Sequence, residues 1–185
     1  MTNRAPSASP REFVRTIRIR RAAALLGIAL LGMASVSGCR RADDLGPPPI
    51  AYGQAECEFC KMIISEEPFA AAAVITTADD VYKYAFDDIG CLLDFLNEPG
   101  RTGRIRSYVH DQATLAWLDA SHAVYIRSES LHTPMASHVA ACSSADAAET
   151  LAQRYPGTTL RFEQLQAEAA QRLVSANRTS ERTAP

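Results

Sequence analysis

Two cysteines and a methionine lie close together in the segment Cys57-Glu58-Phe59-Cys60-Lys61-Met62. Thiolate and thioether sulfurs are soft donors that suit Cu(I). A second methionine, Met135, follows Pro134 in a turn-like context. Because neither Met62 nor Met135 stands in an apolar run, simple core packing does not account for their placement. A soft-metal site is therefore one interpretation of these residues.

The C-x-x-C pair is also compatible with a redox dithiol, half of a zinc site or a structural disulfide. A zinc site needs further paired ligands, whereas Cys91 and Cys142 stand singly. A thioredoxin-like motif places the pair at a helix start after a strand, whereas Cys57 and Cys60 precede the first predicted strand. These arguments weaken the zinc and redox interpretations, and all three stay open.

The remaining cysteines and two histidines are weaker candidates. Cys91 falls in the first turn of a predicted helix, where it is either a small buried hydrophobe or a thiol whose pKa the helix N-terminus lowers. Cys142 alternates with apolar positions, which favours burial in a strand. His132 and His138 flank Met135 and each offers a nitrogen ligand, although a histidine in a loop is usually solvated.

The N-terminal region has the order of a secretory signal peptide. A basic stretch, residues 15–21, precedes an apolar stretch, residues 22–33, that is too short to span a membrane. The segment Val36-Ser37-Gly38-Cys39 resembles a bacterial lipobox, which implies cleavage after residue 38 and a lipid on Cys39. We expect a protein anchored on the periplasmic side of a bacterial membrane. Arg40 replaces the acidic residue that favours inner-membrane retention, so the outer membrane is open as well as the inner one.

Charge argues against nucleic acid as a partner. Residues 1–38 carry six arginines and one glutamate, whereas the rest of the chain carries 13 basic and 20 acidic residues. A mature chain this acidic is a poor ligand for phosphate backbones. After Cys39, a charged and proline-rich segment reads as a tether. From Arg40 to Ala55 it spans at most ~50 Å when extended.

Hydrophobic periodicity predicts an α+β fold of two similar ββαβ modules in tandem. The first module has expected strands at residues 69–76, 81–86 and 105–110 and a helix at Ile89–Leu96 capped by Asp87 or Asp88. The second has expected strands at residues 123–126, 137–141 and 159–162 and a helix at residues 145–155 capped by Ser143 or Ser144. The expected segments are a signal peptide (1–38), lipidated Cys39 with its tether (39–55), modules at 56–112 and 113–165, and a C-terminal helix and disordered tail (166–185).

Several segments in order resemble the NosL family of copper-binding lipoproteins. After the lipobox these are Cys57-Glu58-Phe59-Cys60-Lys61-Met62-Ile63-Ile64, Phe86-Asp87-Asp88-Ile89-Gly90-Cys91-Leu92, Tyr108-Val109-His110-Asp111, Trp117-Leu118-Asp119-Ala120 and Thr133-Pro134-Met135-Ala136-Ser137. The resemblance covers residues 36–165 and implies two ββαβ modules. It also implies a non-enzymatic periplasmic Cu(I) chaperone that serves the assembly machinery for the copper centres of nitrous oxide reductase.

By the same resemblance, the candidate Cu(I) ligands are Cys57, Cys60, Met62 and Met135. We add Cys91 to this set, with His138 as an extra ligand. Three departures stand out, because the family usually has glycine where this chain has Lys61, Ala136 and His138. They put the recipient in doubt, so a relative that serves another copper enzyme stays open. The main functional alternative is a lipoprotein thiol–disulfide oxidoreductase that uses Cys57 and Cys60, and a third is an anchored structural domain with two disulfides.

Overall fold

The structure of the protein, a computed structural model, describes residues 45–183. The predicted signal peptide, the lipobox cysteine Cys39 and the beginning of the tether lie outside the described residues. Within the described part of the chain, no helix combines the length and apolar character needed to cross a membrane.

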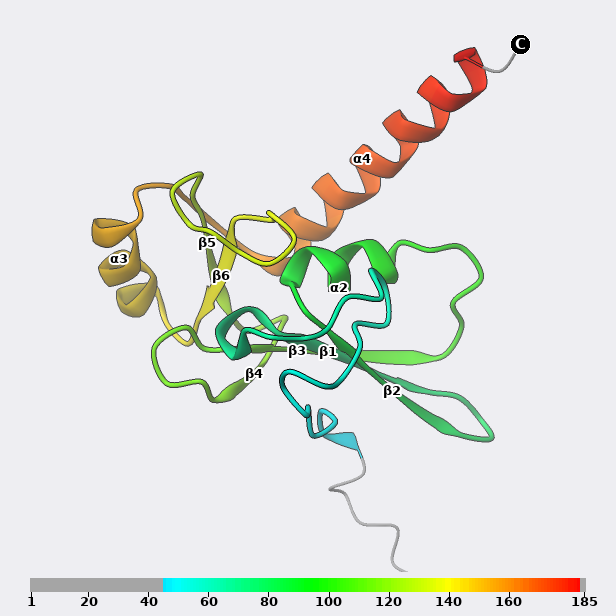
Figure 1. Ribbon diagram of the computed structural model, residues 1–185, viewed down its shortest axis with the longest axis horizontal. Helices are drawn as coiled ribbons and strands as arrows, with labels where there is room; N and C mark the ends of the chain where they lie inside the picture. Colours follow the sequence, from blue (N-terminus) through cyan, green and yellow to red (C-terminus); the bar gives the residue numbers. More distant parts are fainter. Residues whose placement is uncertain (1–44, 184–185) are drawn as a thin grey trace, which may run out of the picture. The chain divides into compact units, whose positions relative to one another are not determined.

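The first module is an antiparallel sheet with one helix on its face (Figure 1). The sheet has the strand order β2-β1-β3-β4. Its elements are η2 (Glu67–Phe69), β1 (Ala71–Thr76), β2 (Val81–Phe86), α2 (Ile89–Leu96), β3 (Arg104–His110) and β4 (Trp117–Asp119). The order from β1 to β3 confirms the predicted ββαβ module, and α2 has the predicted bounds.

The second module repeats this order with a smaller sheet, in the strand order β6-β5-β7. Its elements are β5 (Val124–Arg127), β6 (Val139–Cys142), α3 (Ala145–Arg154) and β7 (Thr158–Leu160). The α+β class with two ββαβ modules is therefore confirmed. β4 had not been predicted, and it extends the first sheet beyond the boundary expected at residue 112.

Helix α2 forms because its apolar positions recur on one face and its first turn is capped. The Asp88 side chain accepts a hydrogen bond from the backbone N–H of Gly90, and Leu92, Leu93 and Phe95 are buried. Phe95 packs between Tyr84 and Phe86 of β2, with ring centroids 4.9 and 4.8 Å apart. These buried residues hold α2, whose first turn carries Cys91, over one face of the first sheet.

A buried aspartate joins the two modules. The carboxylate of Asp111 accepts hydrogen bonds from the backbone N–H groups of Thr114 and Ser143, at 2.8 and 2.7 Å. The backbone N–H of Gln112 also donates to the carbonyl of Ala141 on β6. The end of β3 therefore bonds to the strand that follows the Met135 segment.

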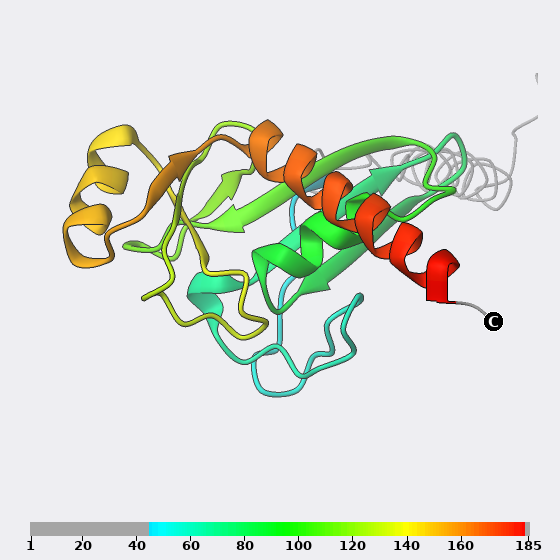
Figure 2. The ribbon, with the colours of Figure 1, turned by 90° about the horizontal axis from the view of Figure 1, so that it is seen from above.

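Two expectations about the ends of the folded part need correction. Helix α4 (Phe162–Thr183) is longer than predicted and continues through most of the segment 166–185, where a shorter helix and a disordered tail were expected. Leu165 and Ala169 are buried in the core, which anchors the helix beside α2 (Figure 2). At the other end, Ile50 and Tyr52 pack against the core, so the tether ends well before Ala55.

Candidate metal centre

Three cysteine side chains converge beside the N-terminal turn of α2. The sulfur atoms of Cys57, Cys60 and Cys91, the cysteine triad, all lie within 4.8 Å of one another. Cys57 and Cys91 are buried and Cys60 is half-buried, and all three are free thiols. Among the described residues, the triad is thus a group that is close enough to hold one metal ion.

Backbone hydrogen bonds close the C-x-x-C segment into a tight loop. The N–H of Cys57 donates to the carbonyl of Met62 at 2.8 Å, and the N–H of Lys61 donates to the carbonyl of Cys57 at 3.0 Å. The N–H of Glu58 donates to the carbonyl of Ala85 at 2.9 Å. Because Ala85 belongs to β2, this last bond attaches the loop to the edge of the sheet beside α2.

Among the three thiols, hydrogen bonds favour the thiolate form of Cys57. A hydrogen bond from the Cys91 thiol, aided by backbone N–H donors at Cys60 and Asp87, lowers the pKa of Cys57 from 9.0 to about 5. Donating that hydrogen bond, together with burial, raises the pKa of Cys91. Burial also raises the pKa of Cys60. Of the two alternatives given for Cys91, burial is the one found. Its pKa is raised, not lowered, because its thiol donates a hydrogen bond to Cys57.

We expect the reduced metal-free protein to keep one thiolate at neutral pH. Its ultraviolet thiolate absorbance should titrate with a midpoint at about pH 5, because the pKa of Cys57 is lowered to about 5. Cys57→Ser should abolish that transition, whereas Cys142→Ser should preserve it because burial raises the pKa of Cys142 to about 11. A wild-type transition confined to alkaline pH would contradict the assignment.

The same shift predicts how stability follows pH. Between the folded pKa of Cys57, about 5, and its ordinary value of 9.0, the unfolded chain binds more protons than the folded one. This group therefore adds stability that is complete above pH 9 and is lost as the pH falls through about 5. The raised pKa values of Cys60 and Cys91 act in the opposite sense above pH 9, where the unfolded chain loses protons that the fold retains.

Asp88 brings the Met135 segment to the triad. Its buried carboxylate uses Oδ1 to cap α2, accepting from Gly90 N–H at 2.6 Å, and uses Oδ2 to accept from Met135 N–H at 3.0 Å. The approach is close, because a Cβ atom added to Gly90 would lie 2.9 Å from Cβ of Ser137. The Met135 loop, residues 133–138, is thereby held against the turn of α2 that carries Cys91.

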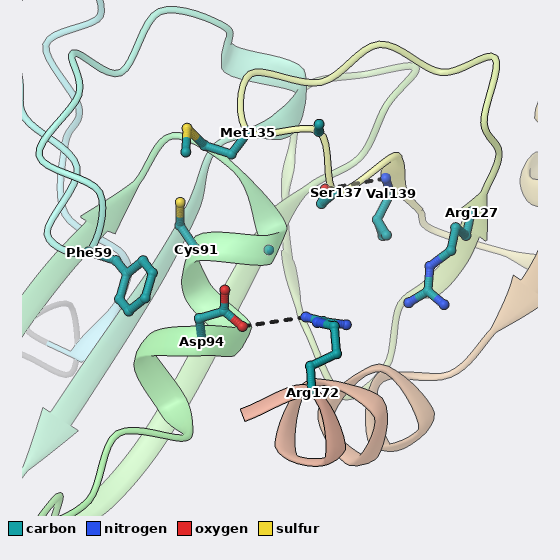
Figure 3. A pocket seen from close by; sticks show the side chains of 10 residues that line it. Phe59, Cys91, Asp94, Arg127, Met135, Ser137, Val139 and Arg172 are labelled. Atoms are coloured by element: carbon teal, nitrogen blue, oxygen red, sulfur yellow. Dashed lines mark hydrogen bonds and ion pairs between the residues drawn. The ribbon is translucent and has the colours of Figure 1, made fainter. Parts of the chain in front are cut away.

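Met135 and Cys91 line one cavity of about 310 Å³. Figure 3 shows their two sulfur atoms on the same side of α2, with Phe59 beside them. Across the cavity, Arg172 of α4 pairs with Asp94 of α2 at 3.4 Å. The cavity connects the buried thiol of Cys91 with the surface, and the thioether of Met135 lies along its wall.

Asp87 holds the C-x-x-C loop in place, as Asp88 holds the Met135 loop. Its carboxylate, which is buried, accepts a hydrogen bond from Ser65 N–H at 3.0 Å, and its backbone N–H donates to the sulfur of Cys57. From the sequence, either Asp87 or Asp88 was expected to cap α2. Asp88 is the residue that caps α2, and the carboxylate of Asp87 binds the backbone N–H of Ser65 instead.

Met62 and His138, the other two candidate ligands, do not line this cavity. The side chain of Met62 is 59% exposed, at the rim of the C-x-x-C loop, and its backbone N–H donates to Cys60. The ring of His138 is turned to its own loop: Nδ1 lies 2.8 Å from the carbonyl oxygen of Leu131, and Nε2 lies 3.9 Å from a carboxylate oxygen of Glu129. The geometry thus groups Met135 with Cys91 and leaves His138 with other partners.

The three departures from family glycines share a backbone conformation. Lys61, Ala136 and His138 have φ angles of 61°, 54° and 59°, in the left-handed region. Glycine adopts this region freely, whereas a Cβ atom adds about 1–2 kcal/mol of strain. The loops on both sides of the site therefore keep a glycine-type conformation without glycine.

We expect Ala136→Gly to stabilise the protein by about 0.5–1 kcal/mol. The left-handed strain that it relieves should exceed the conformational entropy that glycine adds to the unfolded chain. Denaturant unfolding would measure the change. Ala78→Gly is the matched control: Ala78 is an exposed turn alanine outside the left-handed region, so glycine should not stabilise there. Equal effects at the two positions would refute the strain argument.

The sequence and the structure are both similar to known proteins of one family. The sequence model of the NosL family matches residues 50–170. A crystal structure of the copper chaperone NosL from Shewanella denitrificans is similar to this structure with a TM-score of 0.55 and 24% sequence identity, covering 64% of this chain and 94% of that chain. At that identity the likeness shows the fold. No curated protein matches the chain.

Proposed function

Because the chain belongs to the NosL family, we propose that it is a copper carrier that binds Cu(I) at the cysteine triad and passes the ion to another protein. The observation that carries this proposal is the convergence of Cys57, Cys60 and Cys91, whose sulfur atoms lie within 4.8 Å of one another. The structure of a copper chaperone of the same family has a similar fold.

The donor set suits Cu(I) in both number and type. Metal–thiolate bonds are about 2.3 Å long, so two sulfurs on one ion lie no more than about 4.6 Å apart. The sulfur atoms of the triad lie within 4.8 Å of one another, close to this limit for two ligands, and three sulfurs bound to one ion would draw together to about 4.0 Å. Thiolate and thioether donors favour Cu(I), and the thioether of Met135 lines the same cavity as Cys91.

The surroundings of the triad favour transfer over permanent storage. Cys60 is half-buried, and the apolar side chains of Phe59, Met62 and Met135 are exposed around it to 36, 59 and 44%. An exposed apolar rim with soft donors gives a recipient both a docking surface and a route for ligand exchange. A carrier of this kind performs no catalytic turnover of its own.

We further propose the cellular setting that the lipobox and the family suggest. Cys39 carries the lipid, the folded part lies on the periplasmic side of the membrane, and the recipient belongs to the machinery that assembles the copper centres of nitrous oxide reductase. Reconstituting that assembly with and without the copper-loaded carrier would test the recipient. If the reductase acquires its copper equally well without the carrier, this part of the proposal fails.

The alternative of a thiol–disulfide oxidoreductase has one observation in its favour. The pKa of Cys57, lowered to about 5, makes it an activated thiol close to Cys60. Redox exchange, however, requires neither a third cysteine at the same place nor a methionine beside it. A reversible disulfide with efficient turnover of a reduced substrate, in a protein that does not compete for Cu(I), would favour the oxidoreductase.

An anaerobic Cu(I) competition titration tests the carrier directly. We expect the reduced protein to bind one tightly held Cu(I) per chain, and Met135→Ala to weaken that binding. Met62→Ala tests the other candidate thioether, and we expect a smaller loss there because Met62 is 59% exposed and does not line the cavity. Tight binding unaffected by Met135→Ala would remove Met135 from the site, and failure to compete for Cu(I) would overturn the proposed function.

A further inference from the structure

The described part of the chain begins on the face of the first sheet that lies away from α2. The hydroxyl of Tyr108 donates to the carbonyl of Leu45 at 2.8 Å, and the hydroxyl of Tyr52 lies 3.0 Å from Nε2 of His110. Tyr108 and His110 are two residues apart on β3 and so share a face. In Figure 1 the beginning of this segment, in cyan, lies below β1 and β3, with α2 above them.

Three basic residues share that face. The strand register pairs Val74 of β1 with both Lys83 and Arg106, and pairs Thr76 with Arg104. Paired residues of an antiparallel ladder point to the same side of the sheet. The same register places Tyr108 on that side. Arg104 and Arg106 are exposed.

An aromatic residue extends this surface. Trp117 of β4 pairs with His110, and their ring centroids lie 3.7 Å apart. One acidic residue shares this side of the sheet: Asp119 pairs with Tyr108 on the edge strand β4. The acidic turn 79–80 lies beyond the end of β1. We call Lys83, Arg104, Arg106 and Trp117 the basic face. Tryptophan beside arginine and lysine is typical of surfaces that meet phospholipid headgroups.

The length of the chain before Leu45 places this face near the membrane. Under the proposed lipidation of Cys39, only residues 40–44 separate the anchor from Leu45, and an extended chain spans at most about 20 Å over that distance. We propose that the basic face rests on anionic phospholipid headgroups. The cysteine triad, held by α2 on the other side of the sheet, then faces away from the membrane toward soluble partners.

The protein carries its own reporter for this contact, because Trp117 is its single tryptophan. The mature lipoprotein would be reconstituted into phosphatidylethanolamine–phosphatidylglycerol vesicles and into phosphatidylcholine vesicles, each containing a headgroup spin-labelled lipid. We expect strong quenching of Trp117 fluorescence in the anionic vesicles, and much weaker quenching in phosphatidylcholine or at high salt. Equal quenching in the two vesicle types would overturn the proposal.

Charge removal on the basic face gives the second arm of the test. Each cation near an anionic surface strengthens binding about five-fold, so Arg104→Gln combined with Arg106→Gln should weaken the contact about 25-fold. Arg154→Gln combined with Arg161→Gln removes two exposed arginines from the second module and should change nothing. Unchanged quenching in the first double variant would contradict the proposal.

This inference rests on the proposed anchor, and intact mass spectrometry of the same sample separates the two. A chain without lipid contradicts the anchor, and the orientation inferred from it falls as well. If the chain is lipidated but the quenching of Trp117 changes neither with lipid charge nor with the Arg104 and Arg106 substitutions, the result contradicts the basic face alone. Cu(I) binding by the triad is measured independently of both.

Discussion

Cys57→Ser is expected to weaken Cu(I) binding by more than about 100-fold, beyond the usual effect of a residue that only supports a ligand. Cys57 is the thiol whose pKa is lowered to about 5, so it offers a metal ion a ready thiolate. It also accepts hydrogen bonds from the Cys91 thiol and the Asp87 backbone, which hold its sulfur in place. Competition with a chromophoric Cu(I) chelator would measure the loss.

Cys142→Ser is the control for this prediction. It makes the same chemical change at a thiol that is also buried, but in β6, beside a cavity lined by residues of α3. We expect it to lower the free energy of unfolding without changing Cu(I) affinity. Equal losses of affinity in the two variants would show that folding, not ligation, is affected, and full affinity in Cys57→Ser would remove Cys57 from the site.

The elements that were predicted well are those with a local physical signal. Ile89–Leu96 has its apolar residues at helical spacing and an aspartate before its first turn, and α2 has the predicted bounds. Ser144 caps α3 in the same way, accepting from Ala147 N–H at 3.1 Å. Because each module repeats such signals in the same order, both ββαβ units could be predicted without knowing how they pack.

The elements that were missed depend on tertiary contacts. β4 is three residues long, too short for any periodicity, and exists because it pairs with β3. The segment before Ala55 reads as a polar tether, yet Ile50 and Tyr52 find apolar partners on the folded domain. Helix α4 begins at Phe162, before the segment 166–185 in which a C-terminal helix was expected, because Leu165 and Ala169 pack into the core.

The candidate site was predictable in its residue types but not in its geometry. Soft donors at Cys57, Cys60 and Met135 were visible in the sequence, whereas the role of Cys91 required knowing that α2 lies beside the C-x-x-C loop. Cys142 stands before α3 much as Cys91 stands at the start of α2, but the second module has no C-x-x-C loop beside it. One of two similar modules therefore contains the triad.

Asp88→Ala is expected to have the second-largest effect, because it acts on both stability and copper binding. It removes a helix cap, worth about 1 kcal/mol, and leaves the Met135 N–H without its partner, at a cost of about 1–3 kcal/mol. The free energy of unfolding should therefore fall by about 2–4 kcal/mol. Ser144→Ala, which removes only the cap of α3, should cost about 1 kcal/mol and leave Cu(I) affinity unchanged.

We expect Asp88 to affect Cu(I) affinity by positioning Met135. Releasing the Met135 loop from α2 should weaken Cu(I) binding about ten-fold, as for other residues that orient a ligand. In a Met135→Ala background the same substitution should cost no further affinity, because the thioether that Asp88 positions is already gone. A double-mutant cycle in Cu(I) affinity separates the two cases. Additive losses would mean that Asp88 acts on the cysteine triad through the cap of α2, and that the hydrogen bond to Met135 is structural only.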